Sequence, residues 1–113
     1  MKITHKENAI ERKNSDYCLV TEYPKWDEAL DFAIVRLNGR YPEEQRVTNT
    51  MCKEIVYVQE GQGAVEVEGK RYSLKAGDVV LIEVGEKFFW EGEMTLFISC
   101  RPAFYIEQHQ AVE

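Results

Sequence analysis

The chain has 113 residues, 44% of them apolar and 30% charged, a balance that fits one globular domain over residues 1–113 and excludes disordered and fibrous proteins. Its net charge of −6 argues against a nucleic-acid partner, because phosphate backbones are bound through basic surfaces. Residues 1–16 are interrupted by charges, so we expect no export signal, no membrane partner and a cytoplasmic location.

The N-terminal part of the chain has uneven strand character. Met1–Asp16 is highly charged and predicts a loose arm or an edge strand. Tyr17–Tyr23 is richer in strand formers and predicts a strand. Trp26–Phe32 has some helical character, but the apolar run Leu30–Leu37 and the turn signal Asn38-Gly39 favour a strand that ends in a hairpin turn.

The centre of the chain predicts a hairpin. Gly39–Cys52 is polar and aperiodic, which predicts a loop followed by an entering strand. Glu54–Glu60 and Ala64–Glu68 are rich in β-branched residues and flank Gly61-Gln62-Gly63, so we predict two strands joined by a turn at these glycines. A second turn is predicted at Gly69-Lys70.

The C-terminal half continues with short strands and turns. Ala76-Gly77-Asp78 predicts a turn before the strand Val79–Val84, and Gly85 ends that strand before the aromatic cluster Phe88–Trp90. Met94–Cys100 is the last clear strand. Short strands separated by regular turns, without a convincing long helix, are typical of an antiparallel sandwich or barrel.

Cysteine number and spacing favour free thiols. Cys18, Cys52 and Cys100 show no Cys-x-x-Cys spacing and are odd in number, which fits neither a disulfide framework nor a standard zinc site. Cys52 and Cys100 fall near predicted strands, and no histidine stands near either in the sequence. We therefore expect small buried hydrophobes rather than catalytic nucleophiles.

Two spaced glycine patterns resemble the two motifs of the cupins, which are small jelly-roll barrels. Glu54, six further residues and Gly61 match the second half of the first motif, and Gly77 and Gly85 stand at the spacing of the second. The resemblance covers about residues 30–100. It implies an all-β fold, the double-stranded β-helix or jelly-roll barrel of the cupins, with this segment as the core barrel between an N-terminal arm and a C-terminal tail.

The same resemblance implies that the family's metal ligands are missing. Only Glu54 keeps the type of residue that the family uses, and the two histidines of the chain, His5 and His109, lie near its ends. A metal ion needs three or four converging donors, so we expect no metal and no cofactor. The weak alternative is Glu54 with Cys52 or a tail histidine. The ligand positions of the motifs hold Val47 and Asn49, or Thr48 and Thr50 if the gap is one residue shorter, followed by Phe88 and Gly92.

Four residues form the predicted ligand-binding pocket: Glu54, Asn49, Phe88 and Trp90. Glu54 would be a ligand-anchoring acid or a general base inside the barrel, or a remnant of the metal site held by Asn49, Thr48 or water. Phe88 and Trp90 alternate on one strand face. They would either form an apolar wall against a sugar ring or simply fill the core.

The function expected from this pocket is non-enzymatic binding or sensing of a small molecule such as a carbohydrate. The alternative is a metal-independent isomerase or epimerase acting on a carbohydrate derivative, in which Glu54 would work with Tyr57 or Tyr105. A metal-dependent dioxygenase is disfavoured by the missing ligands.

Two surface expectations complete the prediction. Apolar residues on the outward face of the barrel, such as Ile55 and Tyr57, together with the resemblance, predict a homodimer. The tail Ala103–Glu113 is expected to be mostly exposed. Alternating apolar residues are assigned to the core or to a subunit contact: Val65, Val67, Val79, Leu81 and Phe97.

Overall fold

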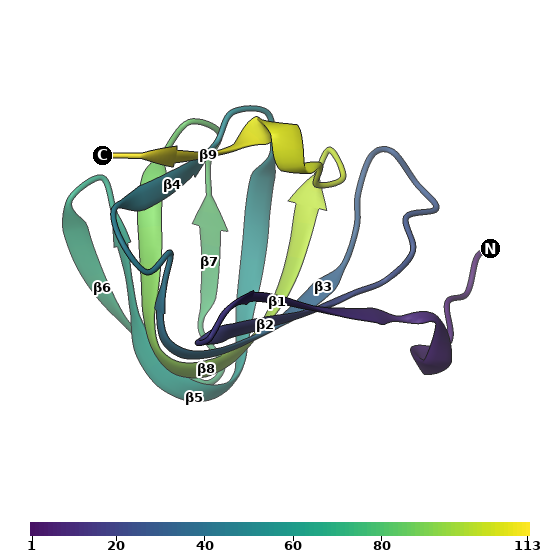
Figure 1. Cartoon of the computed structure of the whole chain (residues 1–113), viewed down its shortest axis with the longest axis horizontal. Coiled ribbons are helices and arrows are strands. Elements are labelled where there is room, and N and C mark those ends of the chain that lie inside the picture. Colours follow the sequence, from purple (N-terminus) through teal and green to yellow (C-terminus); the bar gives the residue numbers. More distant parts are fainter.

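Nine strands and two single turns of 3-10 helix make up the computed structural model, which describes residues 1–113 (Figure 1). No α-helix is present, which confirms the all-β fold class. No helix is therefore long and apolar enough to cross a membrane. The elements are η1 (Lys6–Asn8), β1 (Ile10–Ser15), β2 (Cys18–Glu22), β3 (Ala33–Tyr41), β4 (Arg46–Asn49), β5 (Lys53–Val67), β6 (Lys70–Lys75), β7 (Val79–Ile82), β8 (Lys87–Arg101), η2 (Ile106–Gln108) and β9 (His109–Val112).

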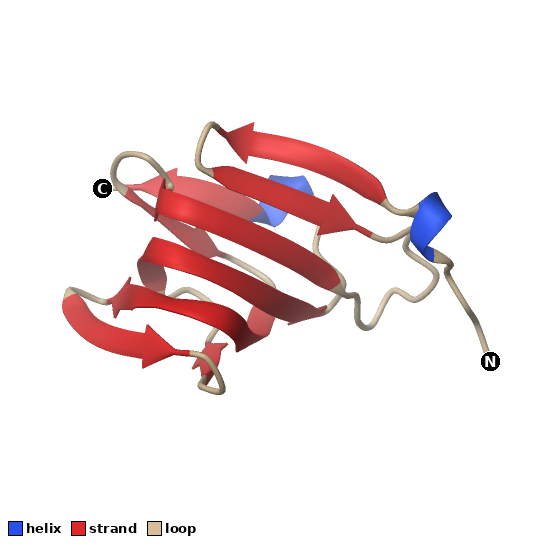
Figure 2. Cartoon of the chain, turned by 90° about the horizontal axis from the view of Figure 1, so that it is seen from below, coloured by secondary structure: helices blue, strands red, loops and turns tan.

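The strands form one antiparallel sheet that curls around an interior. Along one path the order is β1-β2-β3-β8-β4-β9, while β5 pairs with β6, β7 and β8. Figure 2 shows the β1–β2 hairpin on one side of this curved sheet and the β5–β6 hairpin on the other. The two 15-residue strands, β5 and β8, pair along nearly their whole length, so their curvature gives the barrel its shape.

Glycines at the bend of β5 and β8 let the two backbones approach closely. A Cβ atom on Gly61 would lie 2.0 Å from the carbonyl oxygen of Glu93, and one on Gly92 would lie 2.5 Å from the Cα of Gly63. Gly61 and Gly92 also have positive φ angles of 89° and 137°. The predicted turn at Gly61-Gln62-Gly63 is therefore wrong: these residues bend one continuous strand, and the aromatic cluster likewise belongs to the continuous strand β8.

The predicted turn at Asn38-Gly39 is also wrong, because both residues lie inside β3 and pair with Glu93 and Gly92 of β8. Trp26–Phe32, the segment with some helical character in its sequence, contains no helix. By contrast, the turn near Gly69 is confirmed. It joins β5 to β6 through positive φ angles at Glu68 (50°) and Gly69 (81°), as a tight hairpin turn requires.

Both ends of the chain contribute a short strand to the sheet. The N-terminal segment contains β1, an edge strand paired with β2, which is one of the two forms expected for it. The C-terminal segment contains β9, which pairs with β4, and its residues Ala103 and Gln108 are buried. Six of the eleven residues from Ala103 to Glu113 are exposed, as expected, and the tail is buried only where it is held against the barrel.

The core forms where strand alternation turns apolar side chains inward. On β5, Val56 and Val58 are fully buried, while Ile55 and Tyr57 point outward. Thirteen residues make up the main buried cluster, Val65 among them. Val79 and Leu81, which we expect in the core or in a subunit contact, are exposed and lie outside this cluster.

Candidate functional site

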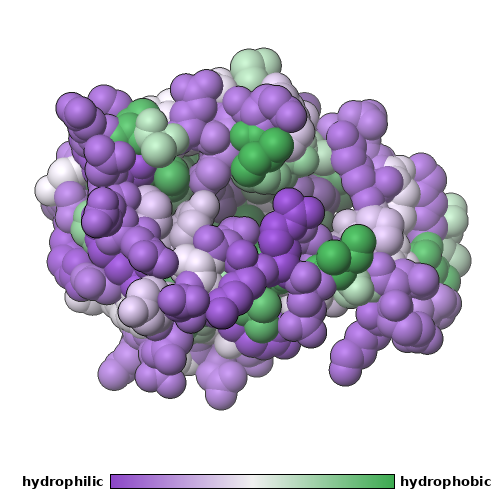
Figure 3. Space-filling model, viewed as in Figure 1, coloured by the Kyte–Doolittle hydropathy of each residue, from purple (hydrophilic) through white to green (hydrophobic).

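A cavity of about 370 Å³ lies within the curl of the sheet. Fifteen of its 22 lining residues are hydrophobic. The lining comes from strands β1, β2, β3, β5 and β8, from the segment between β2 and β3, and from the C-terminal segment. Figure 3 shows the molecular surface hollowed near the middle of one face, with apolar side chains inside the hollow. A mostly apolar cavity of this size with a few polar groups is typical of a small-molecule site.

Glu54 is the buried acid of this cavity. It belongs to the inward-facing set of β5, is only 6% exposed, and accepts a hydrogen bond at Oε1 from Asn49 Nδ2 over 2.8 Å. Burial raises the pKa of Glu54 from its ordinary value of 4.5 to about 7, the hydrogen bond from Asn49 opposes that rise, and the negative charge of Asp31 adds to it. Its Oε2 atom has no hydrogen-bond partner in the protein. Near neutral pH this acid therefore exists in both protonation states.

Asn49 connects Glu54 to the C-terminal tail. Its Oδ1 atom accepts hydrogen bonds from Gln108 Nε2 (3.0 Å) and from His109 Nδ1 (2.8 Å). Because an amide oxygen can only accept, His109 must carry its proton on Nδ1. Asn49, a ligand position in the first of the two motif alignments, therefore lies beside Glu54. Thr48, a ligand position in the second, has its Oγ1 atom buried without a hydrogen-bond partner.

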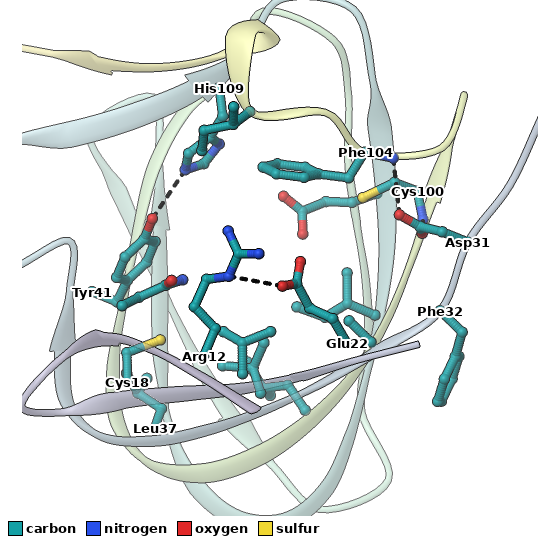
Figure 4. A pocket seen from close by; sticks show the side chains of 18 of the residues that line it. Arg12, Cys18, Glu22, Asp31, Phe32, Leu37, Tyr41, Cys100, Phe104 and His109 are labelled. Carbon is teal, nitrogen blue, oxygen red and sulfur yellow. Dashed lines mark hydrogen bonds and ion pairs between the residues drawn. The ribbon is translucent and has the colours of Figure 1, made fainter. Parts of the chain in front are cut away.

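His109 and Tyr41 extend the network along the wall of the cavity (Figure 4). The Tyr41 hydroxyl lies 3.1 Å from His109 Nε2 and donates to it when the imidazole is neutral. Burial lowers the pKa of His109, which favours this neutral form. Burial, followed by the charges of Cys18 and Glu54, raises the pKa of Tyr41 to about 12, so its hydroxyl stays protonated.

Gln108 clamps the tail onto the turn that precedes β5. Its Oε1 accepts hydrogen bonds from the backbone N–H groups of Met51 (3.2 Å) and Cys52 (3.1 Å), while its Nε2 donates to Asn49. Its backbone carbonyl accepts from both the N–H (2.9 Å) and the hydroxyl (3.0 Å) of Thr50. The tail therefore fixes the orientation of the amide that holds Glu54.

The structure brings three of the four predicted pocket residues to the cavity: Glu54, Phe88 and Trp90. The two rings are buried and meet edge to face with centroids 6.2 Å apart. Asn49 does not line the cavity but holds Glu54 from behind. The proposed acids Tyr57 and Tyr105 do not line the cavity and are 43% and 39% exposed, so the alternative that paired them with Glu54 is not supported.

Sequence reasoning missed two groups of cavity residues. The first is Tyr41 with His109, which are 68 positions apart and meet only because β9 pairs with β4. The second is an ion pair on the β1–β2 hairpin, where Arg12 Nε lies 3.0 Å from Glu22 Oε1. The one signal in the sequence was the two-residue spacing of Arg12 and Asn14, which places both side chains on the same face if this segment is an edge strand.

The cysteines are unpaired and buried. Burial raises the pKa of Cys18 to about 11, and burial is also the main cause of the raised pKa values of Cys52 and Cys100. All three thiols are therefore protonated near neutral pH, which leaves them poor nucleophiles.

The residues around Glu54 do not fit a metal site of the kind that cupins build from histidines and a glutamate. No three side chains of His, Cys, Asp or Glu lie close enough together to hold a metal ion. The groups near Glu54 are the amide of Asn49, which donates to it, the carboxylate of Asp31, which is held by backbone N–H groups, and the protonated thiol of Cys100 on the paired strand. His109 directs Nδ1 to Asn49 and Nε2 to Tyr41, so neither ring nitrogen is free to bind a metal beside Glu54.

Comparison with solved structures shows a shared fold at low sequence identity. The nucleoside dehydratase Pac13 from Streptomyces superposes with a TM-score of 0.89 over 100% of this chain and 92% of that chain, at 18% identity. Variants of Pac13 with a tyrosine or a histidine replaced were solved with uridine. An RmlC-like cupin from Shewanella frigidimarina has a TM-score of 0.77 at 17% identity, covering 95% of this chain and 96% of that chain.

A third structural relative is KdgF from Halomonas sp., with a TM-score of 0.70 at 15% identity over 89% of this chain and 94% of that chain. No curated protein is significantly similar to the chain in sequence. The sequence pattern of the family described as "Cupin domain" matches residues 34–98, which is more than half of the 113 residues. With the curled all-β sheet around an internal cavity, this match shows that the protein belongs to the cupin domain family.

Proposed function

We propose that the protein binds a small sugar-containing molecule in its cavity and performs metal-independent acid–base chemistry on it. The observation that carries this proposal is the carboxylate of Glu54, which is buried in the cavity wall and has a pKa of about 7. A buried acid whose pKa lies near neutral pH is suited to take up and release a proton. Asn49 holds one carboxylate oxygen, which leaves Oε2 for the ligand.

Glu54 is the base in this proposal, and Tyr41 is the group that supports the opposite charge. The Tyr41 hydroxyl is held by His109, and because a hydroxyl hydrogen rotates, it can turn from the imidazole to a substrate oxygen. Removal of a proton from carbon by Glu54 would leave negative charge on that oxygen, which Tyr41 would stabilise. Isomerisation, epimerisation and loss of water can all begin with this step, and Pac13 is described as a dehydratase.

The composition of the cavity wall supports a sugar-like ligand. Phe88 and Trp90 offer an apolar surface, whereas Glu54, Tyr41 and His109 offer hydrogen-bonding groups. A sugar ring carries both C–H faces and hydroxyl groups, so it can use both kinds of surface. Uridine, a nucleoside with such a ring, is present in the Pac13 structures.

The test uses glucose, fructose and glucuronate as probes in deuterated water. We expect the protein to catalyse deuterium incorporation next to the carbonyl of at least one probe, and Glu54→Gln to abolish it while the probe still binds. Glu60→Gln, on the exposed part of the same strand, is the matched control and should leave incorporation unchanged. Turnover that survives Glu54→Gln would contradict the role of Glu54.

Non-enzymatic binding is the second candidate, and the apolar character of the cavity favours it, since 15 of the 22 lining residues are hydrophobic. A purely binding protein would give saturable chemical-shift changes with uridine or a sugar but no deuterium incorporation and no product. That result would support the binding function in place of the enzymatic one.

We also propose that the protein forms a homodimer through the outer face of its sheet. Ile55 pairs with Leu81, and Tyr57 pairs with both Val79 and Phe97, so these side chains form one continuous apolar patch. Ile55 and Leu81 are each 50% exposed. Continuous exposed apolar surface is typical of protein interfaces, and light scattering should give about twice the mass of one chain.

A further inference from the structure

The edge strand β1 directs polar side chains toward the cavity. Arg12 pairs with Val20 of β2, and paired residues of antiparallel strands share a face of the sheet. Val20 is a core residue that lines the cavity, so Arg12 faces inward, and Asn14 does so two residues later. The inner face of β1 therefore presents an arginine and an amide, whereas the neighbouring strands β2 and β3 present mostly apolar side chains, with Glu22 of β2 as the charged exception.

Two of the three nitrogen atoms of the Arg12 guanidinium group have no hydrogen-bond partner in the protein. Its Nε atom is 3.0 Å from Glu22 Oε1, but the structure gives no partner for its two terminal nitrogens. Figure 4 shows this group projecting into the cavity, with His109 on one side and Cys18 and Leu37 on the other. A guanidinium group with two free NH₂ groups matches the oxygen geometry of a carboxylate or a phosphate.

The other charges near the opening leave Arg12 as the group best placed to receive an anion. Asp31 accepts hydrogen bonds from the backbone N–H groups of Cys100 (2.7 Å) and Phe104 (2.9 Å). Lys25, which also lines the cavity, is paired with Glu28 at 2.9 Å. Asp31 thus has its own donors, and Glu22 occupies only Arg12 Nε, so the two terminal nitrogens of Arg12 have no acceptor in the protein.

We propose that Arg12, assisted by Asn14, binds an anionic oxygen group of the ligand, a carboxylate or a phosphate, at the opening of the cavity. This inference rests on the proposed function, because the same ligand would reach Glu54 with its reactive part. It narrows the substrate class from sugars in general to acidic or phosphorylated sugar derivatives. An inward-pointing charge can also protect an edge strand from pairing with another chain, and the experiment separates the two roles.

The test compares neutral and anionic probes of nearly the same shape. Dissociation constants of uridine and uridine monophosphate, and of glucose, glucuronate and glucose 6-phosphate, are measured by calorimetry on the full chain. We expect the anionic member of at least one set to bind about ten times more tightly or better. Glucuronate and glucose 6-phosphate distinguish a carboxylate from a phosphate.

Variants assign the preference to Arg12. Arg12→Met should abolish it, whereas Lys13→Met removes the same charge from the opposite face of β1 and should retain it. Glu22→Gln removes the competing carboxylate and should strengthen anion binding several-fold. A melting curve for each variant checks that the fold is intact.

Two results would overturn the proposal: no anionic probe binds more tightly than its neutral partner, or the two methionine variants lose the preference equally. These outcomes are separate from failure of the proposed function, because binding is measured without turnover. If Glu54→Gln kept both turnover and the anion preference, the proposed base would be wrong and the anion site would stand.

Discussion

On β5, Glu54 faces the cavity and is 6% exposed, whereas its neighbour Ile55 faces solvent and is 50% exposed. The usual distribution would place the apolar side chain inside and the charged one outside. Each position raises the free energy of the folded chain, because burial opposes ionisation of the acid and exposure of the apolar group to water is unfavourable. This inverted distribution fits the two proposals made above, a small ligand against the inner face of the strand and a second copy of the chain against its outer face.

The largest expected effect is the loss of catalysed deuterium incorporation when Glu54, on the inner face, is changed. Glu54→Gln keeps the shape of the side chain but removes the base, so deuterium incorporation should fall by about 10²–10⁴-fold. Ile55→Gln, one residue away on the outer face, should leave the rate unchanged. Equal losses in both variants, measured by mass spectrometry, would break the division between the two faces.

The second effect is a dependence of stability on pH that originates from the inner face. In the unfolded chain Glu54 ionises near pH 4.5, but in the folded protein its pKa is about 7, so the folded state binds the extra proton between these values. Stability therefore falls as pH rises from about 4.5 to about 7 and is flat above that range, by about 3 kcal/mol in total for this group.

Urea unfolding at several pH values checks this sign. Glu54→Gln cannot ionise, so it should remove this fall and gain stability relative to the natural protein as pH rises toward 7. The raised pKa of Glu54 would be contradicted if the free energy of unfolding of the natural protein rose over this pH range at least as steeply as that of Glu54→Gln.

A smaller effect is expected on the opposite wall of the cavity. Tyr41→Phe removes the hydroxyl that His109 holds but keeps the ring, and should lower the rate of deuterium incorporation by about tenfold or more. The dissociation constant of uridine should change less than the rate. A larger change in binding than in rate would make Tyr41 a ligand-binding residue instead.

The smallest effect on the free energy of unfolding of one chain is expected on the outer face. The double variant Ile55→Gln and Leu81→Gln should reduce the mass seen by light scattering to that of a single chain, because both side chains lie in the apolar patch. As exposed positions, they should change the stability of the isolated chain by only about 0.5 kcal/mol each. A mass that is unchanged would exclude this patch as the interface.

Local sequence signals predicted the elements that local chemistry decides. The turn at Gly69 has a short-range cause, the positive φ angles that glycine tolerates, and it was predicted correctly. The glycines Gly61 and Gly63 look similar in the sequence, but a partner strand decides their conformation. Their lack of side chains accommodates the close approach of β8, some 30 residues later, and nothing in the local pattern distinguishes such a bend from a turn.

The candidate site shows the same limit. Motif spacing identified Glu54, and alternation along one strand identified Phe88 and Trp90 as neighbours on one face. The contact between Tyr41 and His109 was not predicted, because it depends on the pairing of β4 with β9. Each of these strands has four residues, which is too short for a clear sequence pattern. The inward face of β1 escaped because its alternation is polar on both sides.

The clamp made by Gln108 has a practical consequence for anyone handling this protein. Gln108 and His109 hold the Asn49 amide that donates to Glu54, and the backbone carbonyl of Glu113 accepts a hydrogen bond from Arg46. An affinity tag or a reporter fused after Glu113 would therefore load the hydrogen bonds that position Glu54. The opposite terminus lies away from the barrel (Figure 1), so fusions belong there.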